Sequence, residues 1–346
     1  MNLKRLSELL ELSPTTVSRA LNGYPEVNAE TRKRVLAAAK SHGYAANTMA
    51  RRLATGRAMA IGHVVPLAEH DMINPIFADF LAGAGEVYSS SGYNMIVSVV
   101  SVEREIEAYQ SMAASQNVDG VIVHAPLAND RRFEVLEALG LPFVAHGRGE
   151  DAARYSWVDI RNRKAFRQAT ERFIHCGHRR IGLINGMKSM TFAQRRHAGY
   201  CDALSSAGLS VAPELVRHSD MTEPYGYETA NEMLDLADPP TAFLASSLMI
   251  AFGINRAITE RGLMLGRDIS VITHDDALPF LPNGGDSPVF ASIRSPIRGH
   301  GRRAAEILID LIEERKPGPV TDLWEVEQLD GPSIGPGPFA NERATA

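Results

Sequence analysis

Apolar residues recur at helical spacing in the first part of the chain. Leucines stand three or four positions apart within residues 3–10, and Asn2 precedes them as an N-cap. A second short helix is predicted after Ser13, which suits the N-cap position. Pro14 suits the first helical position, because its missing N–H would have no partner there.

The second helix has an unusual polar face. Its inward positions carry apolar side chains, namely Val17, Ala20 and Leu21. Its outward positions carry Thr15, Thr16, Ser18 and Arg19. Asn22 and Gly23 then end the helix. Short hydroxyls near the start of such a helix can reach phosphates or base edges, and an arginine can make a bidentate contact with guanine.

A third helix is predicted after the N-cap Asn28, with Gly43 as its end. Its inward side chains are expected to be Val35, Leu36 and Ala39. Two helices joined by a short turn and closed by a third are typical of a helix-turn-helix unit, whose second helix enters a major groove. On spacing alone, the alternative is a plain three-helix bundle with a solvated polar face.

Residues 46–58 connect this head, residues 1–45, to the rest of the chain. Asn47 can cap a short helix on which Ala50 and Leu53 share one face. A helix this short is marginal in water, so we expect it to form on docking to DNA. Leu53 would then lie between base steps of a minor groove and Arg51 on a phosphate. A flexible linker is the alternative.

From residue 59 onward, short apolar runs alternate with amphipathic segments. The predicted strands are 60–66, 93–100, 119–126, 141–146, 180–186, 241–246 and 268–275. The predicted helices are 77–91, 103–116, 130–139, 162–176, 192–207, 225–237, 248–261 and 298–315. This alternation is typical of α/β folds with parallel sheets, which bind ligands at the carboxyl ends of their strands. Two such series predict a two-lobed core: 59–160 plus 291–319, and 161–290 plus 320–340.

Charge is unevenly distributed along the 346 residues. The first 60 residues hold ten Lys/Arg against four Asp/Glu, whereas the remainder holds 26 against 37. A basic head on an acidic body indicates that the head meets a polyanion. No segment has the roughly 20 consecutive apolar residues of a membrane span, and no secretory signal pattern is present, so we expect a cytoplasmic protein. Cys176 and Cys201 are too few for a disulfide framework and are expected to be buried thiols.

Seven segments, in the same order, resemble members of the LacI/GalR family of bacterial transcriptional repressors. They are "LSELLELSPTTVSRALNG", "VNAETRKRVLAAAKSHGY", "NPIFADFLAG", "HCGHRRIGLING", "RRHAGYCDAL", "DISVITHDD" and "GRRAAEILIDLI". The resemblance implies a periplasmic-binding-protein-like core, a homodimer, a pseudo-palindromic operator and an effector in the cleft between the lobes. It is strongest to regulators of α-glucoside uptake operons in alphaproteobacteria, which implies a sugar effector such as maltose, trehalose or sucrose and no cofactor.

The resemblance also assigns effector-binding residues. Arg196 matches the family's ligand-contacting arginine, and Asp275 matches its cleft aspartate. A guanidinium donates a fork of hydrogen bonds and a carboxylate accepts from paired hydroxyls, which suits a sugar. The other candidates are Phe77, His146, Arg148, Phe192, Met221 and Ser246. Core packing is the alternative for both phenylalanines, and a structural role for His146.

Two departures from the family pattern bear on the size of the effector. Ser246-Ser247 stands where many relatives carry an amide and a carboxylate, and Ser295 where several carry a longer polar group. Both changes would enlarge the cleft, which favours a disaccharide over a monosaccharide or a purine. The tail "GPSIGPGPFANERATA" has no heptads, so we expect a dimer without a tetramerising coiled coil.

Other functions are less consistent with the sequence. His175 and His178, with "HDD" at 274–276, suggest metal or acid–base chemistry, but no carboxylate ligand lies near the two histidines. No P-loop, GxSxG or HExxH motif occurs, so we expect neither an enzyme nor a metal site. A periplasmic sugar-binding protein would need a signal peptide and no head. Activation instead of repression, and a corepressor instead of an inducer, remain open.

Overall fold

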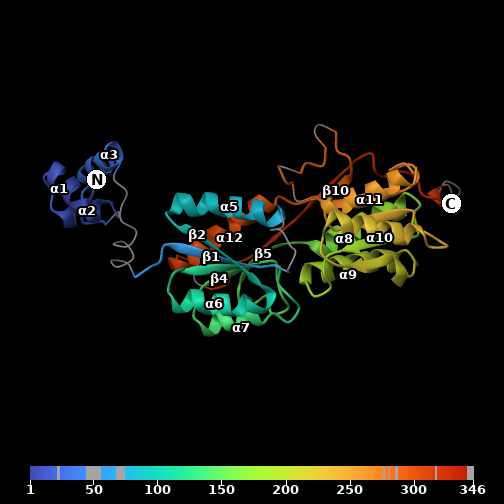
Figure 1. Cartoon of the computed structure of the whole chain (residues 1–346), viewed down its shortest axis with the longest axis horizontal. Coiled ribbons are helices and arrows are strands. Elements are labelled where there is room, and N and C mark those ends of the chain that lie inside the picture. The colour runs from blue at the N-terminus through green and yellow to red at the C-terminus, as the bar shows by residue number, and fades with distance from the viewer. Residues whose placement is uncertain are drawn as a thin grey trace. The chain divides into compact units, whose positions relative to one another are not determined.

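The computed structural model describes residues 1–21, 24–43, 56–67, 75–275, 277–279, 281–284, 287–315 and 318–340. The chain divides into two units, Met1–Met59 and Ala60–Ala346. The first contains the helical head, and the second contains two sheets, each with helices on both faces (Figure 1).

The head consists of three short helices whose N-caps are the predicted ones. The helices are α1 (Leu3–Leu10), α2 (Pro14–Leu21) and α3 (Ala29–Ser41). Side-chain oxygens of Asn2, Ser13 and Asn28 accept the backbone N–H three residues further on, at 2.9, 3.0 and 2.7 Å. Each bond satisfies a donor that has no partner within its helix. These local hydrogen bonds explain why the helix starts were readable from the sequence.

All three helices contribute to the core of the head. Its buried side chains are Leu6, Leu10, Val17, Ala20, Val27, Val35 and Ala39. Leu36 is 48% exposed, so its predicted inward position is wrong. Val35 and Ala39 lie one helical turn apart on the buried face, whereas Leu36 is about 100° further round the helix.

The first lobe of the second unit is a six-stranded parallel sheet with the strand order β11-β5-β4-β3-β1-β2. The strands are β1 (Ala60–Leu67), β2 (Asn94–Ser101), β3 (Gly120–His124), β4 (Phe143–His146), β5 (Ser156–Ile160) and β11 (Thr321–Trp324). One face is covered by α5 (Pro75–Ser91) and α12 (Ile297–Ile312). The opposite face is covered by α6 (Glu105–Ala114), which follows the short helix η1 (Val102–Arg104), and α7 (Arg131–Ala138) (Figure 1).

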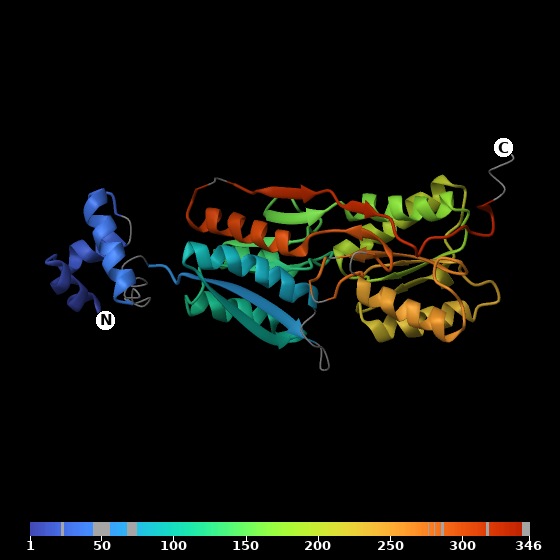
Figure 2. The ribbon, with the colours of Figure 1, turned by 90° about the horizontal axis from the view of Figure 1, so that it is seen from above.

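The second lobe repeats this architecture with the order β12-β10-β9-β8-β6-β7, in which β12 is antiparallel to β10. The strands are β6 (Ile181–Asn185), β7 (Val216–His218), β8 (Ala242–Ala245), β9 (Ser270–Asp275), β10 (Ala291–Arg294) and β12 (Glu327–Leu329). The helices are α8 (Asn162–His175), α9 (Thr191–Ser206), α10 (Glu223–Leu234), α11 (Leu248–Glu260) and the short η2 (Pro213–Leu215). Separate apolar clusters pack α8 and α9 on one face and α10 and α11 on the other (Figure 2).

The described chain passes between the lobes after β5, after β10 and after β11. Residues 291–294 pair with β9 in the second lobe, and residues 321–324 pair with β5 in the first. The predicted subdomain boundaries are therefore wrong at these two strands, although α12 lies in the first lobe as predicted. Each strand has only four residues, so its own pattern does not show which sheet it joins.

Two further properties bear on the sequence-based expectations. Cys176 and Cys201 are partly exposed thiols, so the prediction that both are buried is wrong. None of the helices in the described ranges combines the length and apolar character needed to cross a bilayer.

Candidate DNA-reading surface and effector site

Helix α2 presents its predicted DNA-reading side chains on the outer side of the head. Thr15 and Arg19 are exposed, and Thr16 and Ser18 are partly exposed. The Thr16 hydroxyl shares a 2.8 Å hydrogen bond with the Ser13 hydroxyl, which ties it to the N-cap. Thr15 and Arg19 are four residues apart and therefore neighbours on the helix surface. The exposed pair combines one hydroxyl with one guanidinium.

The remaining predicted DNA contacts lie outside the described residues: Asn22, Asn47, Ala50, Arg51 and Leu53. Two other arginines of the head have a structural role. Arg32 donates to the carbonyls of Tyr24 and Val27 at 2.8 and 3.3 Å, and Arg34 donates to the carbonyl of Leu10 at 2.7 Å. These bonds fasten α3 to the end of α1 and to the loop before α3.

Arg196 lies on α9 in the interior of the second lobe, with 6% of its surface exposed. Its guanidinium carbon is 4.9 Å from the ring centroids of both Phe166 and Phe192. Nε donates to Asn162 Oδ1 and Nη1 to the carbonyl oxygen of Ser246, each at 2.8 Å. Cation–π contacts and hydrogen bonds together fix the plane of the guanidinium. The structure thus brings together three predicted effector residues, Phe192, Arg196 and Ser246.

The ends of β6 and β8 complete this cluster. The Ser246 hydroxyl donates to Asn185 Oδ1 at 2.6 Å. Met221 and Phe192 both approach Gly186, where an added Cβ would stand 2.8 Å from Phe192 and 3.6 Å from the Met221 sulfur. Gly186 therefore lets one further predicted residue, Met221, pack close to Phe192. The sequence reasoning missed Asn185, although its position at a strand end beside Gly186 was a usable signal.

Asp275 ends β9 and is 2% exposed. One carboxylate oxygen accepts the Ala277 N–H at 2.8 Å, and the other lies 3.6 Å from Arg294 Nε. The Ser295 N–H donates to the Asp275 carbonyl at 2.9 Å, so these two predicted positions are adjacent. Ser247, in contrast, caps α11 by accepting the Ile250 N–H at 3.3 Å.

Arg148 is joined to Arg196 by a chain of polar contacts through the start of the second lobe. Its Nε lies 3.0 Å from the buried Asp159 Oδ2, and Asp159 Oδ1 accepts from Asn162 Nδ2 at 3.2 Å. Asn162 in turn accepts from Arg196. Burial raises the pKa of the Asp159 carboxyl, and the charge of Arg148 opposes that rise. The carboxylate within the apolar segment "SWVDI" was the sequence signal for Asp159, which was not singled out.

The first lobe contributes rings at the carboxyl ends of adjacent strands. The centroid of Phe77 lies 4.6 Å from that of His124, which lies 5.9 Å from that of His146. All three side chains are partly exposed, and the two histidines end the paired strands β3 and β4. Phe77 and His146 were predicted, whereas His124 was not. The signal for His124 was the same as for His146, a histidine at the end of a buried apolar run.

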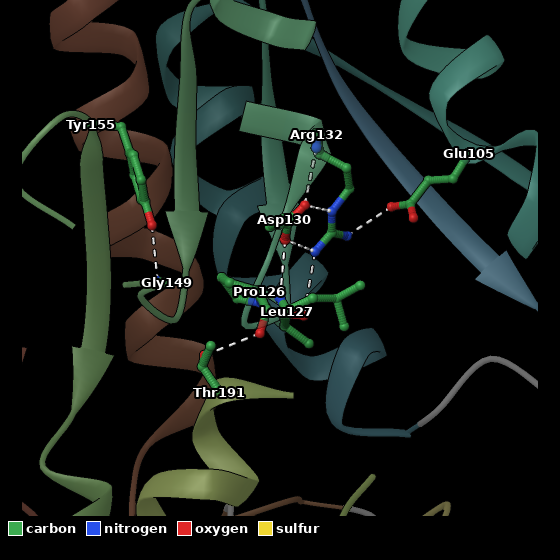
Figure 3. A network of polar contacts seen from close by, with 9 residues as sticks. Glu105, Pro126, Leu127, Asp130, Arg132, Gly149, Tyr155 and Thr191 are labelled. Carbon is green, nitrogen blue, oxygen red and sulfur yellow. Dashed lines mark hydrogen bonds and ion pairs between the residues drawn. The ribbon is translucent and has the colours of Figure 1, made fainter. Parts of the chain in front are cut away.

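One loop of the first lobe contacts the second lobe (Figure 3). The Pro126 carbonyl accepts from the Thr191 N–H at 2.9 Å and from the Thr191 hydroxyl at 3.0 Å. Thr191 is the first residue of α9, the helix that carries Phe192 and Arg196. The loop after His124 therefore joins the first lobe directly to the helix at the centre of the second-lobe cluster.

The buried Arg132 holds this loop in place (Figure 3). Its guanidinium donates to both Asp130 carboxylate oxygens, at 2.8 and 2.6 Å, and to Glu105 at 2.8 Å. Asp130 also accepts the Leu127 N–H at 3.0 Å. Burial alone would lower the pKa of Arg132, but the two carboxylates raise it, so the side chain stays charged. The ion pairs fix the loop whose carbonyl reaches Thr191.

The histidines that suggested enzyme chemistry are part of the fold. His178 bonds Thr241 Oγ1 at 2.8 Å and the Gly335 carbonyl at 3.2 Å. His175 Nδ1 lies 2.6 Å from the Glu171 carbonyl within α8. Over the residues that can be described, no three His, Cys, Asp or Glu side chains form a metal-binding group.

Two family descriptions match the chain. "Periplasmic binding proteins and sugar binding domain of LacI family" matches residues 58–322, and "Bacterial regulatory proteins, lacI family" matches residues 9–47. The chain belongs to the LacI family. It is a transcriptional regulator with a helix-turn-helix head and a periplasmic-binding-protein-like second unit.

Relatives of this LacI-family member match it over nearly their whole length. The HTH-type transcriptional regulator AglR of Rhizobium meliloti (strain 1021) is 45% identical over 98% of this chain and 95% of its own. RafR of Escherichia coli is 31% identical, over 94% and 96%. These relatives are transcriptional regulators, in agreement with a non-enzymatic role.

Solved structures show the same architecture. The transcriptional regulator CelR–cellobiose complex superposes with a TM-score of 0.72 at 29% identity, covering 96% of this chain and 99% of that one. The lac repressor dimer bound to operator and the anti-inducer ONPF gives 0.77 at 25% identity, covering 96% and 98%. This LacI-family regulator therefore shares its fold with both a sugar-bound and an operator-bound relative.

Proposed function

We propose that this LacI-family regulator represses a carbohydrate uptake and utilisation operon and is released by an α-glucoside such as maltose, trehalose or sucrose. It acts in the cytoplasm as a homodimer on a pseudo-palindromic operator and needs no cofactor. Thr15 and Arg19 read base edges, and the ligand lies between the carboxyl edges of the two sheets.

The observation that carries this proposal is the stack of Phe166, Arg196 and Phe192. Phe192 is partly exposed, and an aromatic ring suits the C–H face of a pyranose. The fully buried Phe166 helps to orient the guanidinium, which donates to neighbouring hydroxyls. Asp275, at the end of β9, supplies a carboxylate acceptor for paired hydroxyls.

A disaccharide is favoured over a smaller effector. Ser246 and Ser295 are short side chains at the ends of β8 and β10, where longer groups would occupy space. A solved relative is described as a complex with cellobiose, which is itself a disaccharide. The resemblance to regulators of α-glucoside uptake supports the α linkage.

The mechanism is a shift between two arrangements of the lobes. Sugar held by Arg196, Asp275 and the first-lobe rings stabilises the arrangement in which the lobes are together. It releases DNA only to the extent that it binds that arrangement better than the operator-bound one. The hinge residue Leu53, outside the described residues, would then lose its place between base steps.

Two measurements test the proposed function. A gel-shift assay with the chain's own upstream DNA should show a complex that α-glucosides dissociate. Calorimetry with a panel of maltose, trehalose, sucrose, a pentose and a purine should show binding of an α-glucoside. Binding of only the pentose or the purine would contradict the sugar assignment. A sugar that strengthens the DNA complex would favour the alternative, a regulator with a corepressor.

The oligomeric state has its own test. Sedimentation of the full chain should give the mass of the proposed homodimer. A stable tetramer would contradict the proposal.

A further inference from the structure

Four histidines form a continuous layer across the first lobe. Along the layer from β1 through β3 and β4 to α12 they are His63, His124, His146 and His300. Successive ring centroids lie 5.4, 5.9 and 5.7 Å apart. Because α5 and α12 cover this face of the sheet, His63 and His300 are buried. The layer becomes partly exposed at His124 and His146, the last residues of their strands.

The two histidines at one end of this layer, His63 and His124, form a hydrogen-bonded chain with Tyr88 of α5. His63 Nε2 lies 3.1 Å from the Tyr88 hydroxyl, and His63 Nδ1 lies 3.1 Å from His124 Nε2. His63 is fully buried and Tyr88 is 1% exposed. His124 is thus the only member of this three-residue chain that reaches the surface.

His124 lies at the end of the first-lobe sheet that is next to the second lobe. It ends β3, and parallel sheets of this kind bind ligands at the carboxyl ends of their strands. Two residues later, Pro126 accepts two hydrogen bonds from Thr191 of the second lobe. Phe77, on α5, packs edge-on against the His124 ring with centroids 4.6 Å apart.

Only two arrangements of protons satisfy the chain when both rings are neutral. If Tyr88 donates to His63 Nε2, then His63 donates to His124 Nε2, and His124 carries its proton on Nδ1. If Tyr88 instead accepts, both bonds reverse, and His124 Nδ1 is a bare acceptor. A neutral imidazole has one donor and one acceptor nitrogen, so the orientation of the Tyr88 hydroxyl determines the role of His124 Nδ1.

Burial keeps these rings neutral. It lowers the pKa of His63 to about 3 and places that of His124 well below its usual range. The neighbouring His63, His146 and Arg132 also lower the pKa of His124, because each disfavours a positive charge on its ring. The chain therefore carries no net charge near neutral pH.

We propose that His124 hydrogen-bonds an effector hydroxyl through Nδ1, and that His63 and Tyr88 position this contact and set its donor or acceptor role. The inference rests on the proposed function, because it assigns a contact to the same sugar site. A hydroxyl both donates and accepts, so it fits either proton arrangement. A carboxylate or phosphate accepts only, so it fits one arrangement and gains no charge partner from a neutral ring.

Substitutions along the chain test the contact by calorimetry with the α-glucoside that the wild type binds best. His124→Leu should weaken binding about tenfold, and His124→Asn should restore part of it because its amide can replace Nδ1. Tyr88→Phe should weaken binding about threefold. Tyr93→Phe, at a buried tyrosine just before β2 whose hydroxyl lies 3.5 Å from Glu313, is the matched control and should leave affinity unchanged.

A double substitution separates positioning from packing. If Tyr88 acts through His124, Tyr88→Phe should have no further effect in the His124→Leu background. Additive losses would overturn the positioning role of Tyr88. Unchanged sugar affinity in His124→Leu, with the operator complex intact, would overturn the contact itself.

Ring ¹⁵N spectra of the histidine-labelled full chain test the hydrogen-bonded chain without any ligand. His63 and His124 should both be neutral at pH 7, and Tyr88→Phe should shift the ring nitrogens of both. A charged ring, or spectra that Tyr88→Phe leaves unchanged, would overturn the inference. If the wild type binds no sugar in the panel, the proposed sugar function and the contact with a sugar hydroxyl both fail. The spectra then still show whether the three side chains are coupled.

Discussion

At the scale of single residues, burial distinguishes the arginine at the centre of the candidate site from arginines that lie exposed to solvent. Arg196 is 6% exposed and is held by two aromatic rings and two neutral oxygens. Arg104, by contrast, pairs with Glu107 on the surface, where water screens the attraction between the two charges. The sequence shows the same residue type at both places, and only the surroundings give it different roles.

Replacing Arg196 should therefore affect ligand binding more than charge alone suggests. Arg196→Lys keeps the charge but loses the planar fork, so we expect sugar affinity to fall about 10- to 100-fold. Operator binding should stay within about twofold of wild type, and the sugar should no longer relieve it.

The matched control for this substitution is Arg256→Lys. The guanidinium carbon of Arg256 also lies over an aromatic ring, 3.7 Å from the Tyr227 centroid, but Arg256 is outside the group of residues around Arg196. Equal losses of sugar affinity in the two variants would refute the assigned role of Arg196. Calorimetry and a gel-shift assay provide the two readouts.

The buried His63 predicts a dependence of stability on pH. Its folded-state pKa of about 3 lies below the ordinary value of 6.5, so the unfolded chain takes up a proton that the folded chain does not. His63 therefore lowers the free energy of unfolding as pH falls from about 6.5 towards 3. At pH 5 this loss is about 2 kcal/mol.

The His63→Leu variant tests this term by thermal unfolding at pH 7 and pH 5. Its loss of stability between the two pH values should be smaller than that of the wild type. His175→Gln, an exposed position on α8, should behave as the wild type does. A pH dependence that His63→Leu does not reduce would rule out His63 as its source.

At the scale of secondary-structure elements, the junction between a loop and a helix connects the two lobes. The loop after β3 is fixed by Arg132 and Asp130, and it meets the first residue of α9. One end of this connection follows His124, and the other begins the helix that carries Arg196. The elements were predictable from their own periodicity, whereas their contact was not, because 65 residues separate Pro126 from Thr191.

Thr191→Val should weaken sugar binding by about 2- to 10-fold. The substitution removes the 3.0 Å hydroxyl bond to Pro126 but keeps the shape of the side chain, so it favours the lobes moving apart. Thr259→Val, whose hydroxyl bonds the Asn255 carbonyl within α11, is the matched control. Calorimetry should show unchanged affinity in the control. If Thr191→Val has the same sugar affinity as this control, the contact between Pro126 and Thr191 does not affect ligand binding.

At the scale of the whole molecule, regulation requires that ligand binding and DNA binding favour different arrangements. The second unit has two lobes joined after β5, β10 and β11, which is a suitable hinge for relative motion. A tenfold release of operator needs about 1.4 kcal/mol of differential sugar affinity between the two arrangements. One well-placed hydrogen bond to a hydroxyl is of this order.

Leu53→Ala tests whether residues 46–58, which connect the head to the second unit, contribute to operator binding. If Leu53 lies between base steps, the variant should lose at least about tenfold in operator affinity, since unstacked DNA would no longer be supported. Its sugar affinity, measured by calorimetry, should match the wild type. Normal operator binding by this variant would contradict the hinge mechanism.

Short-range features of this protein follow from the sequence by itself. The caps Asn2, Ser13 and Asn28 were predicted because each bonds a backbone group only three residues away. The helices were predicted because burial of one face imposes a helical period, and the central strands because burial of both faces gives a continuous apolar run. The family motif around Arg196 assigned it to the effector site, and that assignment stays a prediction.

Tertiary structure decided what depends on distant segments. The pairing of His63 with His124 joins residues 61 apart, and Tyr88 reaches His63 from α5, which packs on one face of the first-lobe sheet. Asp159 contacts Arg148 only because its strand places the two residues side by side. The lobes to which β10 and β11 belong were likewise set by their partners. Hydrogen bonds between parallel strands join residues whose separation no local pattern records. The sequence predicted the helices and seven of the strands, and only the fold showed the short remaining strands and which side chains meet.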